Sequence, residues 1–427
     1  MSRKIFISVL GTGNYSPCVY GHVDFRSTDT RFVQQAAMEY VGVKEWKEND
    51  CVYFLLTDSA RTRNWENRLD ERTGNELVGL KNIVASMELA CHCQELSIKT
   101  GNDGNEMWQI FQQLYDIIEE GDEIYMDLTH GFRYLPMLVL VFGNYAKFLK
   151  NVSVCHLSYG NFEAMRELNL DYAPLVDLLP LSELQDWTFA SADFLKNGDA
   201  RNLQKLCNGF VSMLFQQKPG QEQRKMLSDM NKFINALQDL TESMRLCRGH
   251  RILESDKWGY LQKMAEQVKA SVIPPMAPIV TSIQDSFSRF EPSEDVRNGY
   301  HAFVWCYEHN LYQQGITILL ETMISHVAQL YGYAVNDKDD REIVARTINS
   351  LNPKKAEEDQ VEDSGVDKLR EQLLNNEFFD TLLPMYWDLC GIRNDINHSG
   401  LLETAAKNDT FGNKLDKYVT IVNQLIK

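Results

Sequence analysis

The stretch "DEIYMDLTHGFRYLP", from Asp122 to Pro136, predicts a buried strand, a tight turn and the first turn of a helix in one continuous run. The apolar residues before Asp127 are typical of a strand inside a sheet. Pro136 fits the first helical turn, where its missing N–H costs little. A strand that turns directly into a helix indicates an α/β sheet.

The turn itself carries groups that suit an anionic ligand. A hydroxyl, an imidazole, a glycine and a guanidinium stand ahead of the positive end of a helix, at Thr129, His130, Gly131 and Arg133. A capped helix start without any ligand would give the same pattern. Both interpretations stay open on these residues alone.

Strand and helix patterns alternate through residues 1–185. Further strands are predicted at Lys4 to Leu10, Cys51 to Asp58 and Val152 to Gly160, and helices at residues 30–41, 80–96, 106–120 and 135–149. This alternation predicts a Rossmann-like parallel sheet with helices between the strands. The carboxyl ends of such strands share one edge of the sheet, where ligands bind.

The first strand ends in "GTGNY", Gly11 to Tyr15. Its glycines let backbone N–H groups approach a phosphate or a nucleobase. It fails as a dinucleotide fingerprint, because the third glycine of GxGxxG is absent and no helix opens at once. A plain tight turn and a nucleotide-like ligand bound in another way both remain open.

Residues 186–427 show helical periodicity and no convincing strand. Helix breaks at "VIPPMAP", Val272 to Pro278, and at "EPSEDVRN", Glu291 to Asn298, place the start of a C-terminal helical domain near residue 294. The acidic residues 352–368 are expected to form a solvated loop. The predicted fold class is an α/β Rossmann-like N-terminal domain followed by an all-α C-terminal part.

The stretch "RNDINHSG", Arg393 to Gly400, closes a helical pattern. At ~100° per residue, Arg393 and His398 flank one polar face without stacking on each other. A helix end whose cations satisfy the dipole explains this as well as a catalytic site does. Two copies related by a two-fold axis would gather two arginines and two histidines around one cleft. These groups could deprotonate an RNA 2'-hydroxyl, protonate the leaving 5'-oxygen and stabilise the phosphorane without metal.

Composition narrows the choice of function. A chain of 427 residues predicts two or three domains, and a formal net charge of -17 argues against a protein that coats nucleic acid. Nine scattered cysteines, with neither a secretion signal nor a membrane span, predict a cytoplasmic protein. "CHC" at Cys91 to Cys93, interpreted as helical, lacks a second ligand pair, so no metal is expected there.

Two other features receive structural interpretations. His301 and His309 flank an aromatic-rich helical stretch and are expected to pack rather than to bind a ligand. "RLCRGHR", Arg245 to Arg251, is the concentrated basic patch of the middle region. We expect a surface turn there, with contact to RNA or a ligand as the alternative.

Taken together, these motifs resemble the CRISPR-associated CARF-HEPN ribonucleases of type III systems, in the group named for a DxTHG motif. Asp127 to Gly131 matches that motif at every fixed position, and "LGTGNY", "TRFVQQA" and "LTDSARTRNW" extend the resemblance over most of residues 1–185. Arg393 to His398 matches the HEPN pattern of an arginine, four to six residues and a histidine, with the usual polar Asn394 after the arginine.

The resemblance implies a CARF domain at residues 1–185 that dimerises and binds a cyclic oligoadenylate, with tetra-adenylate favoured and hexa-adenylate open. It implies a helical connecting region at residues 186–293 and a HEPN nuclease domain at residues 294–427 that cuts single-stranded RNA in a homodimer or higher homo-oligomer, without cofactor or metal. The catalytic candidates are Arg393, Asn394 and His398. The ligand candidates are Gly11, Thr12, Gly13, Asn14, Tyr15, Thr57, Asp58, Ser59, Thr129, His130, Gly131 and Arg133.

Other functions remain compatible with these residues. One is a sensor whose HEPN part only dimerises or regulates. Another is a phosphodiesterase at the CARF site that degrades the cyclic oligoadenylate, with the hydroxyls and His130 as the groups to test. A Rossmann oxidoreductase is weakened by the missing third glycine and by the helical C-terminal half.

Overall fold

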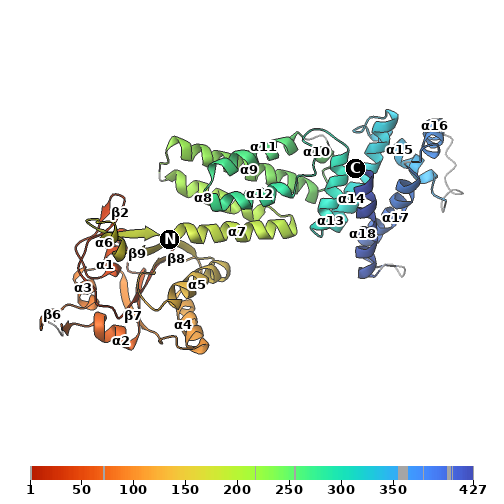
Figure 1. The fold of residues 1–427 in the computed structure, drawn as a ribbon. Coiled ribbons are helices and arrows are strands. Elements are labelled where there is room, and N and C mark those ends of the chain that lie inside the picture. The colour runs from red at the N-terminus through yellow and green to blue at the C-terminus, as the bar shows by residue number, and fades with distance from the viewer. Residues whose placement is uncertain are drawn as a thin grey trace. The chain divides into compact units, whose positions relative to one another are not determined.

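The structure, a computed structural model, describes residues 2–70, 73–216, 218–253, 256–353, 364–377, 379–401, 405 and 407–426, with 408–410 described by their backbone alone. Contacts divide the chain into two compact units, Met1–Gln185 and Asp186–Lys427 (Figure 1). Helix α7 (Leu179–Asn197) runs through this division. The assignment of sensing, connecting and nuclease roles to residues 1–185, 186–293 and 294–427 stays a prediction.

The N-terminal unit is built on an eight-stranded sheet. Its strands are β1 (Lys4–Leu10), β2 (Tyr20–His22), β3 (Phe25–Arg26), β4 (Cys51–Leu56), β7 (His92–Ser97), β8 (Glu123–Asp127), β9 (Ser153–Gly160) and β10 (Ala173–Asp177). Their order across the sheet is β3-β2-β10-β9-β8-β1-β4-β7. A separate ribbon pairs β5 (Arg68–Leu69) with β6 (Glu76–Leu77).

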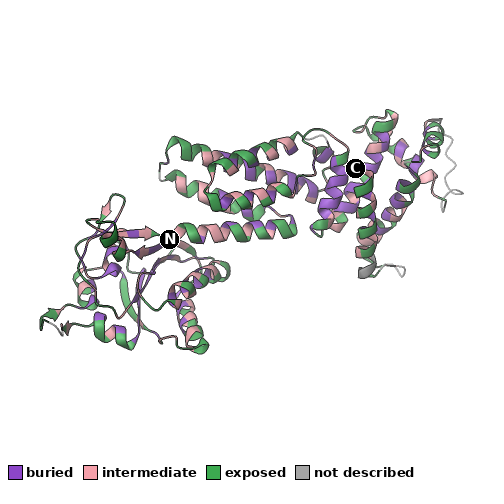
Figure 2. Ribbon diagram, viewed as in Figure 1, coloured by how far each residue is buried: buried purple, intermediate pink, exposed green. Residues whose placement is uncertain are grey.

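Helices cover both faces of this sheet (Figures 1 and 2). The helical elements of the unit are α1 (Val33–Tyr40), η1 (Val43–Glu45), α2 (Asp58–Ala60), η2 (Arg61–Trp65), α3 (Leu80–Ser86), α4 (Gly104–Ile117), α5 (Tyr134–Lys150) and α6 (Phe162–Glu167). Successive side chains of β1 point to opposite faces. Ile5, Ile7 and Val9 therefore join an apolar core with α4 and α5, while Phe6 and Leu10 join another with α1 and α3.

The Rossmann-like α/β fold predicted for residues 1–185 is confirmed, and the four predicted strands correspond to β1, β4, β8 and β9. Pairing among β7, β4, β1, β8 and β9 is parallel, as predicted. The prediction missed the antiparallel part, where β10 pairs with β9 and β3 with β2. Strands β2 and β3 have three and two residues, too few to show a periodic pattern.

The predicted helix over residues 80–96 is wrong in its second half. Helix α3 ends at Ser86, and β7 begins at His92. This strand lies at the edge of the sheet and most of its residues are exposed, so "HCQELS" lacks the apolar pattern of a buried strand. Cys93 thus lies on a strand. No group of three or more potential metal ligands occurs among the residues that the structure describes.

The C-terminal unit is helical, and its described residues contain no strand, in agreement with the prediction. After α7 the elements are α8 (Arg201–Gln216), α9 (Gln221–Arg245), α10 (Gly249–Leu253), α11 (Lys257–Ser271), η3 (Pro274–Met276), α12 (Ala277–Asp285), α13 (Arg297–Glu308), α14 (Tyr312–Tyr331), α15 (Lys338–Ser350), α16 (Ser364–Leu374), α17 (Phe379–Asn397) and α18 (Asn408–Leu425). Both predicted helix breaks lie between helices, at η3 and ahead of α13.

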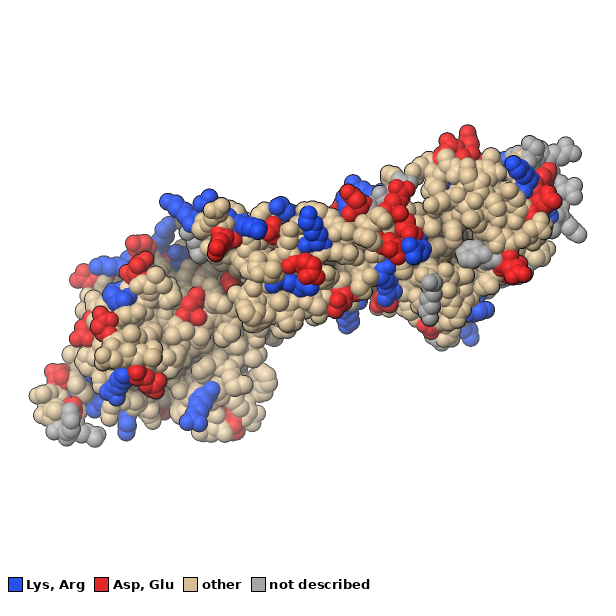
Figure 3. Space-filling view, turned by 45° about the horizontal axis from the view of Figure 1, so that its top comes forward, with Lys and Arg blue, Asp and Glu red and all other residues tan. Residues whose placement is uncertain are grey.

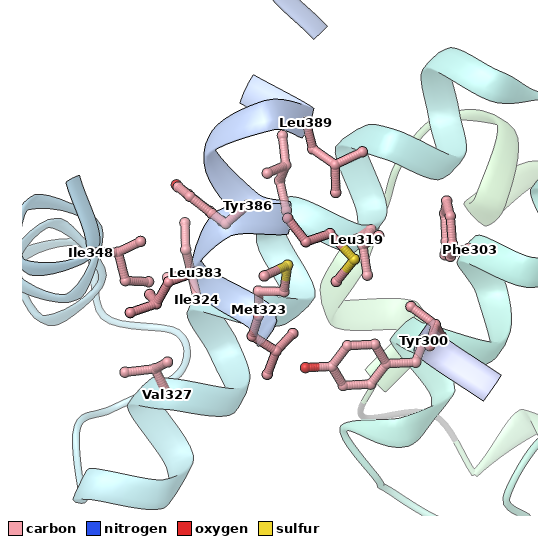
Figure 4. Packing of buried hydrophobic residues seen from close by; sticks show 14 of the residues in the cluster. Tyr300, Phe303, Leu319, Met323, Ile324, Val327, Ile348, Leu383, Tyr386 and Leu389 are labelled. Atoms are coloured by element: carbon pink, nitrogen blue, oxygen red, sulfur yellow. The ribbon is translucent and has the colours of Figure 1, made fainter. Parts of the chain in front are cut away.

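Helix α14 is the centre of the C-terminal core. Leu319 and Met323 of α14 lie among Tyr300 of α13 and Leu383 and Leu389 of α17 (Figure 4). Burying such side chains removes apolar surface from water, at ~25 cal/mol per Å². The core therefore fixes α17 against α14, and with it the residues at the end of α17.

Three remaining expectations concern this unit and the whole chain. His301 and His309 are buried, and His309 stacks on Trp305 with ring centroids 3.9 Å apart, so the packing interpretation is confirmed. Most of the predicted loop at 352–368 lies outside the described residues, while α16 already begins at Ser364. None of the helices in the described part of the chain is long and apolar enough to cross a membrane.

Candidate functional site

The first candidate site lies where the chain changes direction in the sheet. Strand β1 pairs with β4 on one side and with β8 on the other, all parallel. The connections that leave β1 and β8 at their carboxyl ends diverge, and such a switch point opens a crevice for ligands. The loop after β1 and the turn after β8, separated by more than a hundred residues in the sequence, meet in this crevice.

A cavity of about 230 Å³ fills the crevice. The predicted ligand residues that line it are Gly11, Thr12, Gly13, Tyr15, Thr57, Thr129, His130 and Gly131. Apolar neighbours complete the wall, and sequence reasoning did not select them: Val9, Leu10, Phe132 and Leu135. Both backbone turns and apolar walls are thus present, the usual composition of a small-molecule site.

The loop after β1 is held by side chains from neighbouring helices. Asn64 is buried, and its Nδ2 donates to the carbonyl oxygens of Gly11 and Gly13, at 2.9 Å each. Gln34, also buried, donates to the carbonyl of Val9 at 2.9 Å. These carbonyls point away from the cavity toward their donors, so the loop keeps one conformation. Sequence reasoning missed Asn64, although it stands inside the quoted "LTDSARTRNW".

The turn after β8 is fixed by a buried carboxylate. Asp127 accepts from the Ser8 hydroxyl at 2.6 Å and from the Thr129 hydroxyl and N–H at 2.5 and 3.1 Å. Burial raises the pKa of Asp127, and these hydrogen bonds oppose the rise. The Thr129 hydroxyl also accepts from the N–H of Gly160 at 2.8 Å. Thr129 therefore joins the ends of β8 and β9 and has a structural role beside its place in the cavity wall.

His130 and Tyr15 form a stacked pair in the cavity wall, with ring centroids 4.2 Å apart and an angle of 17° between the planes. Burial lowers the pKa of His130 to about 4, so the imidazole is neutral at physiological pH. Its Nε2 is buried and has no hydrogen-bond partner among the described residues. A buried polar atom without a partner at a cavity wall suits a ligand that supplies one.

Gly131 has a conformation that only glycine adopts readily. Its φ is +126°, and a Cβ built at this position would lie 2.8 Å from Cγ1 of Val9 and 3.1 Å from Cδ1 of Leu135. Both contacts are with residues of the cavity wall. The glycine therefore lets the turn approach β1 closely enough to close the cavity.

A second hollow of about 250 Å³ adjoins the first and shares Gly13, Tyr15, Thr129 and His130 with it. Its remaining lining comes from Asn14, Ser16, Tyr20, Tyr159, Gly160, Phe162 and Glu163. The Tyr15–His130 stack thus contributes to both hollows. Of the predicted residues, Asn14 lies in this hollow rather than in the first.

Three predicted ligand residues line neither hollow. Asp58 and Ser59 are exposed in α2, directly after Thr57, whose hydroxyl caps that helix by accepting from Ala60 N–H at 3.3 Å. Arg133 is exposed and occupies the N-cap position of α5. The role of these three residues in ligand binding stays a prediction.

The second candidate site is the end of α17. Arg393 and Asn394 lie in its last turns, and His398 follows, with its N–H donating to the Asn394 carbonyl at 2.9 Å. Arg393 is half-buried, while Asn394 and His398 are exposed. The Nε of Arg393 is buried and has no partner among the described residues. Four cavities among the described residues, at the sheet edge and in the helical unit, are not lined by Arg393, Asn394 or His398.

Charge is spread rather than gathered over the face shown in Figure 3, where Lys and Arg alternate with Asp and Glu. A continuous basic band of the kind that tracks a nucleic-acid backbone is not visible on that face.

Residues 5–163 match the family described as "CRISPR system endoribonuclease Csx1, CARF domain". This range contains the complete lining of both hollows. Among curated proteins, the chain is similar to "CRISPR-associated protein MJ1674" of Methanocaldococcus jannaschii, with 25% identity over 280 residues. The alignment covers 64% of this chain and 40% of the relative, so the matched part spans less than half of the relative's length.

Proposed function

From the match of residues 5–163 to a CRISPR-associated CARF domain, we propose that the chain is a ribonuclease switched on by a cyclic oligoadenylate. The ring binds at the crevice between β1 and β8, and the ends of two α17 helices cut single-stranded RNA without metal. The observation that carries the proposal is the cavity in this crevice, whose backbone turns and unpartnered His130 Nε2 suit a nucleotide.

The cavity volume fits part of a ring and not a whole one. About 230 Å³ in the first hollow and about 250 Å³ in the second can each enclose one nucleobase and part of its ribose. A ring of repeated adenylates has rotational symmetry, so two copies of the chain can each bind one half through identical contacts. Tetra-adenylate fits this division of the ring between two pairs of hollows.

An exposed apolar stripe on α5 supports dimerisation beside the crevice. The α5 stripe consists of Met137, Val141, Tyr145 and Phe148, spaced along one face of the helix, and Met137, Val141 and Phe148 are 72%, 61% and 84% exposed. Residues 134–146 contain no charged side chain. A neutral apolar face of this kind is complementary to a second copy of itself, and contiguous exposed patches of this kind mark interfaces.

The stripe begins close to the ligand site. Helix α5 starts at Tyr134, directly after Phe132 of the cavity wall. Stable interfaces bury ~800 Å² per partner, and large aromatic side chains contribute ~150–250 Å² each. Phe148 and Tyr145, with the aliphatic residues, supply a large part of that area. An interface here would set two crevices beside one two-fold axis.

The chemistry proposed for α17 is a transesterification. A neutral His398 takes the proton of the RNA 2'-hydroxyl, and the resulting oxygen attacks the adjacent phosphorus. The bond from phosphorus to the 5'-oxygen breaks, and a protonated His398 of the second copy donates its proton to that oxygen. The two Arg393 guanidiniums stabilise the charge of the phosphorane. The products are a 2',3'-cyclic phosphate and a 5'-hydroxyl.

The crevice is better suited to binding the ring than to cleaving it. With its pKa near 4, His130 is a weak base for a hydroxyl at neutral pH. Thr129 already donates to Asp127 and accepts from Gly160. The Thr129 hydroxyl is therefore engaged in holding the turn, and the sensing role fits this site better.

The test is cleavage of a fluorescent single-stranded RNA in EDTA, with cyclic tri-, tetra- or hexa-adenylate. We expect wild type to cleave with one ring size only, and the Arg393→Ala/His398→Ala variant to bind the same ring and not cleave. If wild type binds a ring but does not cleave RNA, the proposed nuclease function is wrong and the chain acts as a sensor. Cleavage by the double variant would place the active site elsewhere.

A further inference from the structure

A polar cavity of about 370 Å³ lies within the C-terminal unit, apart from both candidate sites. It opens among the turn between α9 and α10, the helix α14 and the segment ahead of α15. Its polar lining comes from His250, Thr317, Glu321, Ser325, Asn336 and Arg341. This is the turn that contains "RLCRGHR", for which the sequence left a choice between a plain surface turn and contact with RNA.

The floor of this cavity is rigid. The Arg341 guanidinium donates to the Ser325 hydroxyl at 2.8 Å, to the Val335 carbonyl at 2.9 Å and to Oε2 of Glu321 at 2.6 Å. This arrangement holds the Glu321 carboxylate in place at the wall. No hydrogen bond to its Oε1 is found among the described residues, so that oxygen can accept from a ligand.

The turn beside the cavity contains an arginine without an ion pair in the described part of the chain. In the turn, Arg245 pairs with Asp199 at 3.8 Å, and Arg251 pairs with Asp239 at 2.6 Å. Arg248 between them is exposed and makes no ion pair with any residue that the structure describes. It stands one residue from Gly249 and Cys247 of the cavity lining. An uncompensated arginine there suits a phosphate.

Hydrogen bonds connect this cavity with the end of α17. Gln313 Nε2 donates to Oδ1 of Asn397, the residue before His398, at 3.1 Å. The Gln313 carbonyl accepts from the Thr317 hydroxyl at 2.9 Å, and Thr317 lines the cavity. Four residues of helix span ~6 Å. A strand bound at Arg393 and His398 can therefore reach the cavity within a few nucleotides.

We propose that this cavity binds one nucleotide of the RNA strand and sets a base preference for cleavage. The inference rests on the proposed ribonuclease function. Glu321 accepts a hydrogen bond from the amino group of adenine, cytosine or guanine, while Arg248 contacts the flanking phosphate. Uracil is disfavoured, because it has no amino group and its single N–H lies between two carbonyl oxygens that repel the carboxylate.

Binding is tested in the full-length His398→Ala background, in which RNA stays intact. The probes are fluorescent oligouridylate and the same strand with adenosines, followed by fluorescence anisotropy. We expect Glu321→Gln to reduce the preference for the adenosine-containing strand by about tenfold with little effect on oligouridylate. Arg248→Gln should weaken binding of both strands and lower the slope of log affinity against log salt by about 0.7.

A matched control removes a positive charge elsewhere in the same unit. Lys263→Gln lies on α11, outside the cavity lining, and should leave the base preference unchanged. Thermal melting of each variant separates loss of folding from loss of binding. If Glu321→Gln and Arg248→Gln bind both strands as the control does, the cavity holds no RNA and the proposal is wrong.

A photocrosslink distinguishes this proposal from the ribonuclease function on which it rests. RNA carrying 8-azidoadenosine is irradiated with the His398→Ala protein and the crosslinked peptides are identified. Crosslinks to residues 245–253 or 317–325 support the cavity even if wild type cleaves nothing with any ring. Active wild type with crosslinks confined to other segments overturns the cavity and leaves the ribonuclease function standing.

Discussion

The crevice at the sheet edge and the end of α17 differ in how complete each one is within a single chain. In the crevice, the end of β1, the loop after it, the turn after β8 and the start of α5 line one cavity, and Asn64, Asp127 and Gly131 fix its walls. At the end of α17, Arg393 is half-buried, His398 is exposed, and neither lines any of the four cavities at the sheet edge and in the helical unit.

This difference suits a regulated enzyme. A preorganised binding site has higher affinity, because its residues lose little conformational entropy when the ligand binds. An open catalytic surface that needs a second copy stays inactive until two copies meet in the correct arrangement. The ligand shifts that equilibrium only as far as it binds the active arrangement more tightly than the idle one.

The largest expected effect is on catalysis at the open site. His398→Ala should reduce RNA cleavage by about 10²- to 10⁴-fold, because it removes the proposed general acid and base. Binding of the cyclic oligoadenylate should not change, since His398 is far from the crevice in sequence and lies in the other unit. Cleavage and ring binding are measured on the same preparation. His92→Ala, an exposed histidine on β7, is the control and should cleave normally.

The next effect concerns the enclosed site. Gly131→Ala places a Cβ 2.8 Å from Val9 at a φ of +126°, which strains the backbone by about 1–3 kcal/mol. We expect lower thermal stability and at least tenfold weaker ring binding by calorimetry. Gly121→Ala serves as the control, because Gly121 also has positive φ but no atom within 4 Å of its Cβ position. Equal ring binding by both variants would show that the turn does not shape the site.

Acid should weaken the N-terminal unit through His130. The unfolded chain takes up a proton near pH 6.5, whereas burial lowers the pKa of the folded residue to about 4. Stability is therefore lost as the pH falls from about 6.5 to about 4, by an amount on the order of 3 kcal/mol. In the His130→Gln variant, the melting temperature should depend less on pH in this window than it does in wild type. An unaltered slope would mean that His130 is already accessible to water.

Dimerisation at the enclosed site should depend on the α5 stripe. Val141→Asp places two carboxylates in a neutral apolar contact and should weaken association at this face by about tenfold or more. Because the C-terminal unit is also proposed to dimerise, the face is probed by oxidative crosslinking of Val141→Cys. Val23→Cys, 73% exposed elsewhere on the unit, is the matched control. If the two cysteines crosslink equally, the α5 stripe does not form the dimer interface.

The smallest effect is expected at Arg133, which lies outside the cavity at the start of α5. Arg133→Ala should raise the ring concentration needed for half-maximal cleavage by about two- to fivefold, as for an exposed charge near a phosphate. Activation curves for wild type and variant give this shift directly. Superimposable activation curves would show that Arg133 does not take part in ligand binding.

The sequence by itself determined the two fold types and most of the cavity wall. Buried strands such as Lys4 to Leu10 and glycine-containing turns at their ends carry their own local patterns, because periodicity and turn chemistry act over a few residues. The helical pattern that ends near "RNDINHSG" likewise predicted a helix end there, and α17 ends at Asn397. The polar edge strand β7 was not, since an exposed edge has no buried face to impose alternation.

Only the tertiary structure decided which of these residues meet. The stack of Tyr15 on His130, the Asn64 clamp on Gly11 and Gly13, and the cavity around Glu321 join segments far apart in the chain. The order of the strands and the packing of α14 set these contacts, and neither is encoded in a local pattern. Arg133, predicted as a ligand residue, is exposed at the N-cap of α5 and lines neither hollow, and its role in ligand binding stays a prediction. Local sequence patterns cannot tell which predicted site residues lie close together in space. Packing between distant segments decides this, because the free energy of burial depends on contacts across the whole core.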